Sequence, residues 1–138
     1  MLLQTPSLLI TDDDLEFRQT LSDVFEPEGF RTFQAGDGEE ALRIVRQQEV
    51  HVVLLDMHMP RLTGLETLRL LKQFKALLPC ILMSAQLDDV LVEEAHRAQA
   101  YSVLAKPVTF RQITGVVRQA LERTYSWAPP SLPRFGRL

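Results

Sequence analysis

The sequence predicts an α/β fold in which a five-stranded parallel sheet, doubly wound, carries helices on both faces. Short apolar runs alternate with longer amphipathic runs along almost the whole chain, which is the pattern of successive strand and helix units in such folds. The chain has 138 residues, of which 46% are hydrophobic, so it can form the core of one domain of ordinary size. We therefore expect five βα units in order along the chain.

The strands are expected at the apolar runs, each of which is short enough to be a buried strand and too short for an independent helix. The third run contains Val-Val-Leu-Leu and is the most apolar, so we place it at the centre of the sheet. In chain order the predicted strands are 8–11, 30–34, 50–55, 80–83 and 101–104.

The helices are expected where apolar residues recur at a spacing of three or four. Pro27 ends the first, Asp37 precedes the second, and Pro79 follows the third. Asp88 lies at the start of the fourth, and Ile113 belongs to the apolar face of the last. In order, we predict helices at 15–26, at 39–48, from about 63–65 onward, at 87–98 and at 109–123.

The composition divides the chain into a domain over residues 1–125 and a proline-rich tail or linker stub over 126–138. Trp127 with the prolines that follow is either a partner-binding peptide or without a role. The tail is too short for an output domain, and 15 basic residues against 18 acidic ones give a net charge of -3. We therefore expect no nucleic-acid binding within this chain.

The compartment is predicted from what the chain lacks. The only cysteine, Cys80, cannot form an internal disulfide, which favours a reducing environment. The N-terminal residues have neither the basic region nor the apolar length of a signal or membrane segment. We expect a soluble cytoplasmic protein without membrane contact.

Polar residues follow the predicted strands. Asp12 and Asp13 come after the first strand, Asp56 after the third, Ser84 after the fourth and Lys106 just past the fifth. The carboxyl ends of parallel strands meet at one edge of a sheet, where ligands of such folds bind. These five side chains should therefore converge on one cleft.

Three neighbouring carboxylates require a cation to remain ionised. Mg²⁺ prefers oxygen ligands and needs only one or two carboxylates, so it would leave positions open for a phosphoryl oxygen, while Ser84 and Lys106 reach the other oxygens. Asp56 leaves the central strand and is the expected nucleophile, which would form an aspartyl-phosphate. Asp12 and Asp13 are then the metal ligands.

The segments LLITDDD at 8–14, AGDGEEAL at 35–42, VVLLDMHMPRLTGLETL at 52–68, CILMSA at 80–85 and the pair Lys106-Pro107 resemble the receiver domain of two-component response regulators. The resemblance covers roughly residues 7–124. It implies the flavodoxin-like (CheY-like) fold with strand order 2-1-3-4-5. It also implies that Asp56 accepts a phosphoryl group, with Mg²⁺, from the phosphohistidine of a sensor histidine kinase or phosphotransfer protein.

The resemblance assigns further roles at the site. Asp13 and Asp56 would bind Mg²⁺ directly, Asp12 would act through water, and His58 would contribute its backbone carbonyl. Ser84 and Lys106 would bind the phosphoryl group, and the peptide bond before Pro107 would be cis. Phosphorylation would then alter the surface of the last two helices and the strand between them, which meets a downstream partner or an output domain missing from this chain.

Two positions depart from the family pattern. Receivers usually carry an aromatic residue three positions before the lysine, where this chain has Val103. Strand alternation would put Tyr101 on the same face as Val103, so Tyr101 is a candidate substitute. The family also tends to have glycine where this chain has Gln99, so Gln99 is expected either in a strained left-handed conformation or in a different turn.

Two alternatives remain open from the sequence. One is a pseudo-receiver that binds partners without phosphate. The other is a Mg²⁺-dependent phosphohydrolase of the haloacid dehalogenase type, although Glu16 stands where that motif needs Thr or Val and no Asp follows Asp89. The leading interpretation is a signalling phosphoacceptor and not an enzyme, with phosphorylation from small phosphodonors and self-dephosphorylation expected. Homodimer formation is left open.

Overall fold

The computed structural model describes residues 5–128 and confirms the predicted fold. A parallel five-stranded sheet has the order β2-β1-β3-β4-β5. The strands are β1 (Ser7–Thr11), β2 (Arg31–Ala35), β3 (Val52–Asp56), β4 (Cys80–Ser84) and β5 (Ser102–Ala105). The helices are α1 (Leu15–Phe25), the short 3-10 helix η1 (Glu26–Glu28), α2 (Gly38–Gln47), α3 (Gly64–Phe74), α4 (Asp89–Arg97) and α5 (Phe110–Tyr125).

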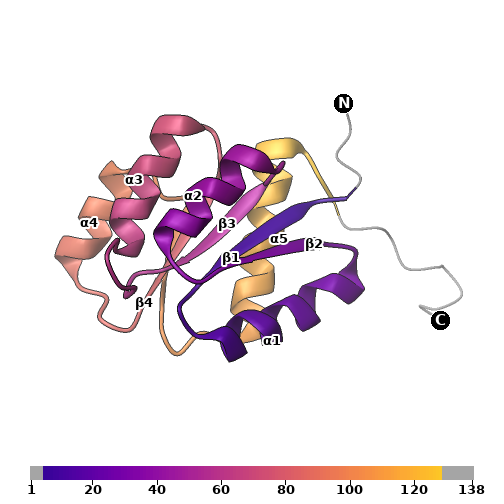
Figure 1. Cartoon of the computed structure of the whole chain (residues 1–138), viewed down its shortest axis with the longest axis horizontal. Helices are drawn as coiled ribbons and strands as arrows, with labels where there is room; N and C mark the ends of the chain where they lie inside the picture. The colour runs from indigo at the N-terminus through magenta and orange to yellow at the C-terminus, as the bar shows by residue number, and fades with distance from the viewer. Residues whose placement is uncertain (1–4, 129–138) are drawn as a thin grey trace, which may run out of the picture.

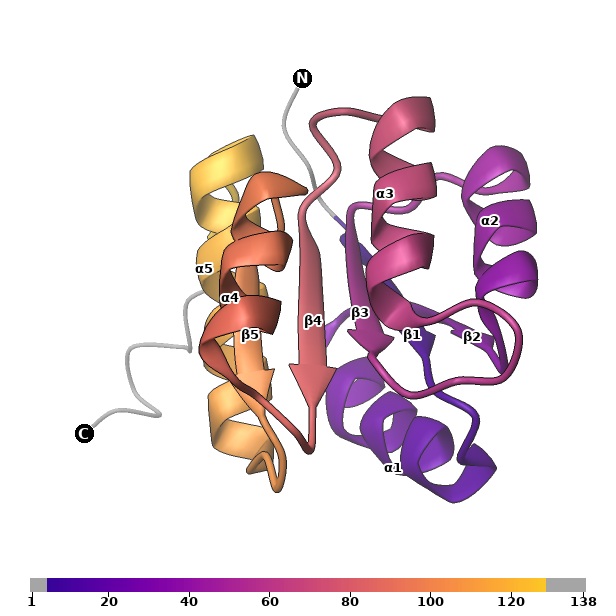
Figure 2. The ribbon, with the colours of Figure 1, turned by 90° about the vertical axis from the view of Figure 1, so that its left-hand side faces the viewer.

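Helices cover both faces of the sheet, as Figures 1 and 2 show. Alternation along the buried strands separates the core into two clusters. Leu8, Ile10 and Leu54 pack with α1 and α5 on one face. Leu9 and Leu55 pack with α2, α3 and α4 on the other. Because β1 and β3 are the second and third strands across the sheet, their carboxyl ends lie near the middle of its carboxyl edge.

Several boundaries differ from the sequence prediction by one or two residues. The third strand begins at Val52 because the backbone N–H of His51 bonds to Ser7 before the regular ladder starts. The first helix ends at Phe25 and continues as η1, which has Pro27 in its first turn; the sequence analysis did not separate these two elements. The last predicted helix, α5, extends to Tyr125. The prediction ended at residue 123 because the apolar pattern fades before the last turn of the helix.

Trp127, which the sequence analysis placed in the tail, belongs to the core. Ser126 ends α5 in a left-handed conformation (φ 56°), and the indole that follows is only 5% exposed. Its ring lies edge-on to Phe30, with 5.7 Å between centroids. Trp127 therefore contributes to the packing of this domain, and residues 129–138 lie outside the described residues.

The structure decides between the two conformations expected for Gln99. Its φ of 65° places it in the left-handed region, which costs a residue with a side chain about 1–2 kcal/mol. The turn is therefore of the shape that glycine normally provides, and its strain is retained between α4 and β5.

The expectation that Tyr101 shares a face with Val103 is wrong. Tyr101 precedes β5, so strand alternation does not govern its side chain. Its ring packs on the α1–α5 side of the sheet, and its hydroxyl donates to Oε1 of Gln119 in α5 at 3.0 Å. Val103 packs on the opposite side, with α2, α3 and α4. Tyr101 therefore does not take the place of the missing aromatic residue.

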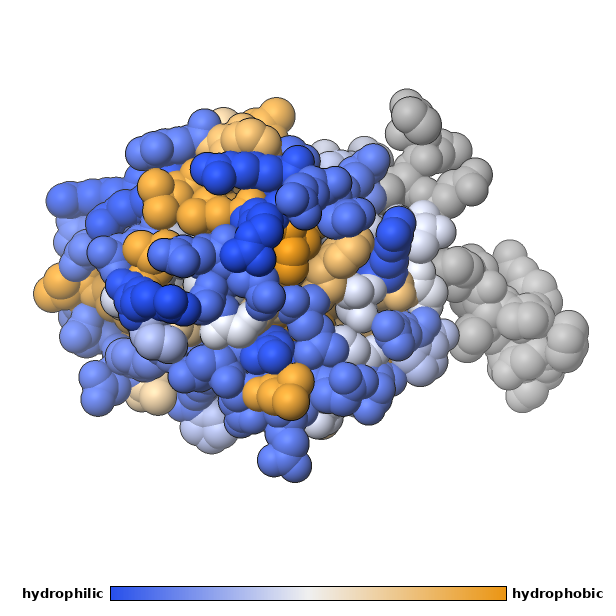
Figure 3. All heavy atoms as spheres, in the orientation of Figure 1, coloured by the Kyte–Doolittle hydropathy of each residue, from blue (hydrophilic) through white to orange (hydrophobic). Residues whose placement is uncertain are grey.

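The outer surface mixes hydrophilic and hydrophobic side chains, and Figure 3 shows several of the latter over α2 and α3. Leu70 and Phe74 of α3 are 37% and 50% exposed. Exposed apolar side chains are common on folded proteins, so buried polar side chains are the more informative feature. Three of these, Asp12, Asp56 and Ser84, lie at the carboxyl edge of the sheet.

Candidate functional site

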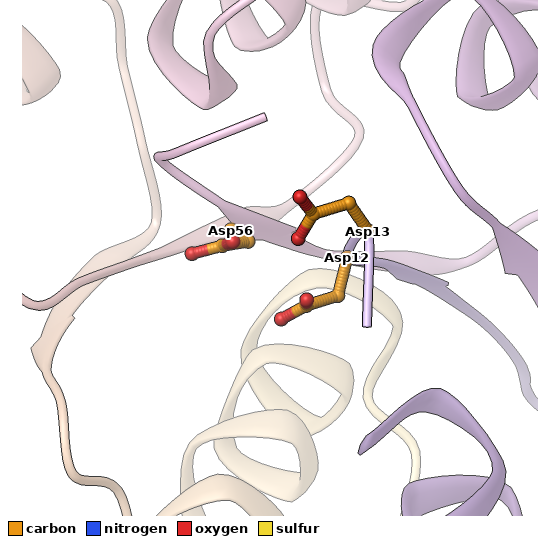
Figure 4. A group of neighbouring side chains, drawn as sticks. All are labelled: Asp12, Asp13 and Asp56. Carbon is orange, nitrogen blue, oxygen red and sulfur yellow. The ribbon is translucent and has the colours of Figure 1, made fainter. Parts of the chain in front are cut away.

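Three carboxylates meet at the carboxyl ends of β1 and β3. Each of Asp12, Asp13 and Asp56 offers an oxygen within 4.8 Å of the others, and Figure 4 shows their side chains around a common space. Asp12 and Asp56 are buried, at 2% and 4% exposure, whereas Asp13 is exposed. The third acid of the run, Asp14, caps α1 by accepting from the N–H groups of the first turn. The convergence of the three acids agrees with the sequence prediction.

Lys106 completes the cluster from 94 positions away in sequence. Its Nζ lies 3.0 Å from Oδ1 of Asp56 and 3.3 Å from Oδ2 of Asp12. The ammonium also stands 5.4 Å from the ring centre of Phe17, within the range of a cation–π contact. The Lys106-Pro107 peptide bond is cis, as the resemblance implied. These groups line a cleft of about 390 Å³ together with Asp14 and Val108.

The charges at the site are interdependent. Burial raises the pKa of Asp12, and the neighbouring Asp56 charge adds to this effect, although the N–H of Asp14 and the ammonium of Lys106 act against it. Burial alone would lower the pKa of Lys106, but its hydrogen bond to Asp56 and the charges of both carboxylates raise it overall. Lys106 is therefore protonated at neutral pH. Its single positive charge faces a cluster of three carboxyl groups.

Glycine brings the backbone of α3 close to Asp56. The N–H of Gly64 donates to the carbonyl of Met57 at 2.9 Å. A Cβ at Gly64 would lie only 2.4 Å from the carbonyl oxygen of Asp56, so no larger residue fits here without a backbone shift. Thr63 and Glu66 start α3 with a reciprocal capping box. Together these contacts fix the chain just after Asp56.

Ser84 ends β4, next to β3 in the sheet, and His58 follows Asp56 by two residues, but neither is among the residues that line the cleft. Ser84 is fully buried at the end of β4, and its hydroxyl accepts the N–H of Gln86 at 3.1 Å. The backbone N–H of Lys106 donates to the carbonyl of Ser84 at 2.8 Å, so the two residues are directly linked. The side chain of His58 is exposed. The sequence thus predicted the strand-end positions of these residues, while their phosphoryl and metal contacts stay predictions.

Two neighbours of the site were not found from the sequence. Phe17 lies in the first turn of α1, and its ring lies within cation–π distance of the Lys106 ammonium. Arg18 donates through Nη1 to the backbone carbonyl of Asp12 at 2.6 Å. A helical arginine carries no pattern that reveals a backbone partner, so only the fold could reveal this contact.

The residues present fit a hard divalent cation. All three side chains of the cluster offer carboxylate oxygens, which Mg²⁺ prefers to nitrogen or sulfur ligands. The exposure of Asp13 beside two buried acids leaves one side of the cluster open to solvent. The cluster could thus hold an ion while leaving coordination positions for water or a phosphoryl oxygen.

Residues 8–118 match the family described as the response regulator receiver domain. The chain belongs to the response regulator receiver family. The haloacid dehalogenase alternative does not apply to a receiver. A relative that covers almost the same length is the sporulation initiation phosphotransferase F of Bacillus subtilis, 34% identical over 119 residues, which are 86% of this chain and 96% of the relative.

Other relatives of this receiver are longer proteins. The aerobic respiration control protein ArcA of Escherichia coli is 31% identical over 88% of this chain but only 51% of its own length. The chain covers 25% of the E. coli regulatory protein AtoC. Among solved structures, a Francisella response regulator receiver domain is 29% identical with a TM-score of 0.80, over 86% of this chain and 98% of that one. The receiver thus occurs both nearly alone and as part of longer regulators.

Proposed function

We propose that this receiver accepts a phosphoryl group on Asp56 from the phosphohistidine of a sensor histidine kinase or phosphotransfer protein, in the presence of Mg²⁺. One observation carries the proposal: Asp56 belongs to the cluster of three carboxylates, and the Lys106 ammonium lies 3.0 Å from its Oδ1. A nucleophile in this position has neighbouring acids that could hold a cation and a positive charge within contact distance. Family membership supports the same chemistry.

In the proposed transfer, a carboxylate oxygen of Asp56 forms a bond to phosphorus as the donor's phosphorus–nitrogen bond breaks and the imidazole leaves. Lys106 moves from its two carboxylate partners to a phosphoryl oxygen, and the hydroxyl of Ser84 donates to another. Asp13 and Asp56 would hold Mg²⁺ directly, with Asp12 acting through water and His58 through its carbonyl. The ion would supply further neutralisation of the charge on the transferred group.

The proposed output is a change in the surface formed by α4, β5 and α5. The hydrogen bond from the Lys106 N–H to the Ser84 carbonyl ties the end of β4 to the residue after β5, so a shift at the phosphoryl group reaches this surface. Its partner would be a downstream protein or an output domain outside this chain, which the half-length coverage of ArcA supports. We place this signalling step in the cytoplasm and treat water attack on the aspartyl-phosphate as self-dephosphorylation, not as enzymatic turnover.

The phosphoacceptor is tested by intact mass after incubation with a small-molecule phosphodonor and Mg²⁺. The wild type should gain one phosphoryl group, and Asp56→Asn or chelation of the metal should abolish the gain. Asp23→Asn is a matched control, because Asp23 is an exposed acid on α1. If the wild type gains nothing under any condition, the pseudo-receiver alternative takes the place of this proposal.

Switching is tested by amide spectra of the phosphorylated protein. The resonances of α4, β5 and α5 should shift, whereas those of α2 should change little. An unchanged spectrum over α4, β5 and α5 would contradict the proposed output surface.

No helix within residues 5–128 is long and apolar enough to cross a membrane.

A further inference from the structure

The side chain of Arg18 connects α1 to the peptide group between Asp12 and Asp13. Nη1 donates to the carbonyl oxygen of Asp12 at 2.6 Å, and Nε donates to Oε1 of Gln34 in β2 at 3.3 Å. The amide nitrogen of Gln34 is itself held by the hydroxyl of Ser22 at 3.2 Å. Because Gln34 has a second anchor in α1, the guanidinium is fixed in position behind the acid cluster.

The peptide group that Arg18 holds lies between two residues of the carboxylate cluster. Its plane is rigid, so the direction of the Asp12 carbonyl constrains ψ of Asp12 and φ of Asp13, the two torsions that help to direct these side chains toward the cluster. The N–H of Asp12 is already fixed by the carbonyl of Ala35 at 3.1 Å, and Oδ1 of Asp12 accepts the N–H of Asp14 at 2.9 Å. Arg18 supplies the remaining contact, to the carbonyl.

The guanidinium also lies near the turn after β2. A Cβ built on Gly36 would be 3.5 Å from Nη1 of Arg18, an ordinary van der Waals separation. The two hydrogen bonds, to Asp12 and to Gln34, are therefore the contacts that hold the guanidinium.

We propose that Arg18 is a positioning residue for the metal site: it orients the Asp12–Asp13 peptide so that both carboxylates face the ion. This inference rests on the proposed function, because it concerns the affinity of the same site for Mg²⁺. Groups that orient metal ligands without touching the ion commonly change metal affinity by about 10–100-fold when removed.

A positioning role and a purely electrostatic role of Arg18 predict opposite changes in Mg²⁺ affinity when the side chain is removed. If Arg18 acted only through its positive charge, its removal would leave the acid cluster more negative and Mg²⁺ would bind more tightly. If it acts by orienting the peptide, its removal weakens binding although a repelling charge has gone. The sign of the change in the dissociation constant therefore distinguishes the two roles.

The experiment is calorimetric titration of the metal-free protein with Mg²⁺, with thermal unfolding in EDTA measured in parallel. Arg18→Met keeps the apolar part of the side chain and should raise the dissociation constant at least tenfold. Arg18→Lys keeps the charge and one donor and should give a smaller rise. Arg43→Met removes the same charge from an exposed arginine on α2 and should leave the constant within about twofold.

The outcomes separate the inference from the proposed function. If the wild type binds Mg²⁺ and Arg18→Met binds it equally or more tightly, the positioning role is wrong, even where its unfolding temperature falls. If Arg18→Met does not fold, an unchanged constant for Arg18→Lys overturns the inference. If the wild type itself does not bind Mg²⁺, the proposed metal site fails, and the inference fails with it.

Discussion

The carboxylate of Asp12 is buried beside the carboxylate of Asp56, and both conditions disfavour its ionised form. Burial and the neighbouring Asp56 raise its pKa, so the folded protein holds this proton more tightly than the unfolded chain does. Above the ordinary pKa of an aspartic acid, the ionised side chain therefore costs folding free energy. This residue is a case in which a functional group lowers the stability of the metal-free fold.

We predict that Asp12→Asn raises the unfolding temperature in EDTA at neutral pH. The rise should be a few degrees, the shift that about 1 kcal/mol produces in a domain of this size. The difference from the wild type should shrink as the pH falls through the raised pKa of Asp12, because the wild-type carboxyl then takes up its proton. Thermal unfolding at several pH values measures both effects.

The control for this prediction is the same pair of proteins with Mg²⁺. The wild type should gain stability from the ion by mass action, while Asp12→Asn should gain less. The difference between their unfolding temperatures should therefore shrink or change sign. A lower unfolding temperature for Asp12→Asn in EDTA at neutral pH would contradict the prediction.

The residues of the site were predictable to the extent that strand ends fix their position. Asp12, Asp56 and Ser84 follow apolar runs directly, and parallel strands bring such positions to one edge. The contact of Arg18 with a carbonyl was not predictable, because every residue offers the same carbonyl and the sequence does not say which one an arginine reaches. The side-chain direction of Tyr101 was wrong because it lies outside the strand whose alternation was applied to it.

At the scale of elements, α3 approaches β3 so closely that one position tolerates only glycine. A Cβ at Gly64 would lie 2.4 Å from the Asp56 carbonyl oxygen and 2.8 Å from Cα of Met57. Neither is the end of a flexible side chain, so α3 and the backbone after Asp56 must move apart. This contact ties the position of α3 to Asp56, the proposed phosphoacceptor.

We predict that Gly64→Ala lowers the free energy of unfolding by about 1–3 kcal/mol, the usual cost of overpacking. Chemical denaturation measures it. Gly115→Ala is the matched control, since Gly115 lies in α5 with open space around a built Cβ; alanine there should stabilise by up to about 1 kcal/mol. Equal effects of the two substitutions would show that the close approach is not tight.

The elements themselves were largely predictable because apolar period and helix caps agree along the chain. Asp14, Asp37 and Asp88 each cap the helix that follows, so the local signals for helix starts were reliable. Strand ends differed by a residue or two because pairing with a neighbour, not apolarity, defines them. Val50 is buried although it precedes β3, which is why the apolar run overestimated that strand.

At the scale of the whole molecule, Trp127 joins the end of α5 to the connection between α1 and β2. Its side chain is 5% exposed and packs on Phe30, which in turn packs on Phe25 at 4.9 Å between centroids. Composition placed this residue in the tail, because proline and the loss of helical period follow it at once. Only the tertiary contact assigns it to the core.

We predict that Trp127→Ala lowers the free energy of unfolding by about 3 kcal/mol, as expected for loss of a buried aromatic side chain. Phe110→Ala is the comparison, because that ring is 44% exposed at the start of α5, and its loss should cost much less. Denaturation followed by circular dichroism suits both variants. A cost below about 0.5 kcal/mol, the range of ordinary surface substitutions, would mean that the indole adds nothing to the core.

The last prediction concerns how the phosphoryl site reaches the α4–β5–α5 surface. Tyr101 packs toward α5 and Val103 toward the opposite face, so no aromatic ring at the usual position connects Ser84 to that surface. The direct connection is instead the hydrogen bond from the Lys106 N–H to the Ser84 carbonyl, at 2.8 Å.

We therefore predict that Tyr101→Phe, which removes only the hydroxyl bond to Gln119, leaves the phosphorylation-dependent amide shifts of α4 and α5 unchanged. Ser84→Ala should reduce the same shifts, because residue 84 then has no hydroxyl that can donate a hydrogen bond to the phosphoryl group and so cannot move with it. Amide spectra of both variants, with phosphorylation verified by intact mass, compare the two routes. If Tyr101→Phe loses the shifts while Ser84→Ala keeps them, the signal passes through the tyrosine and not through the backbone between β4 and β5.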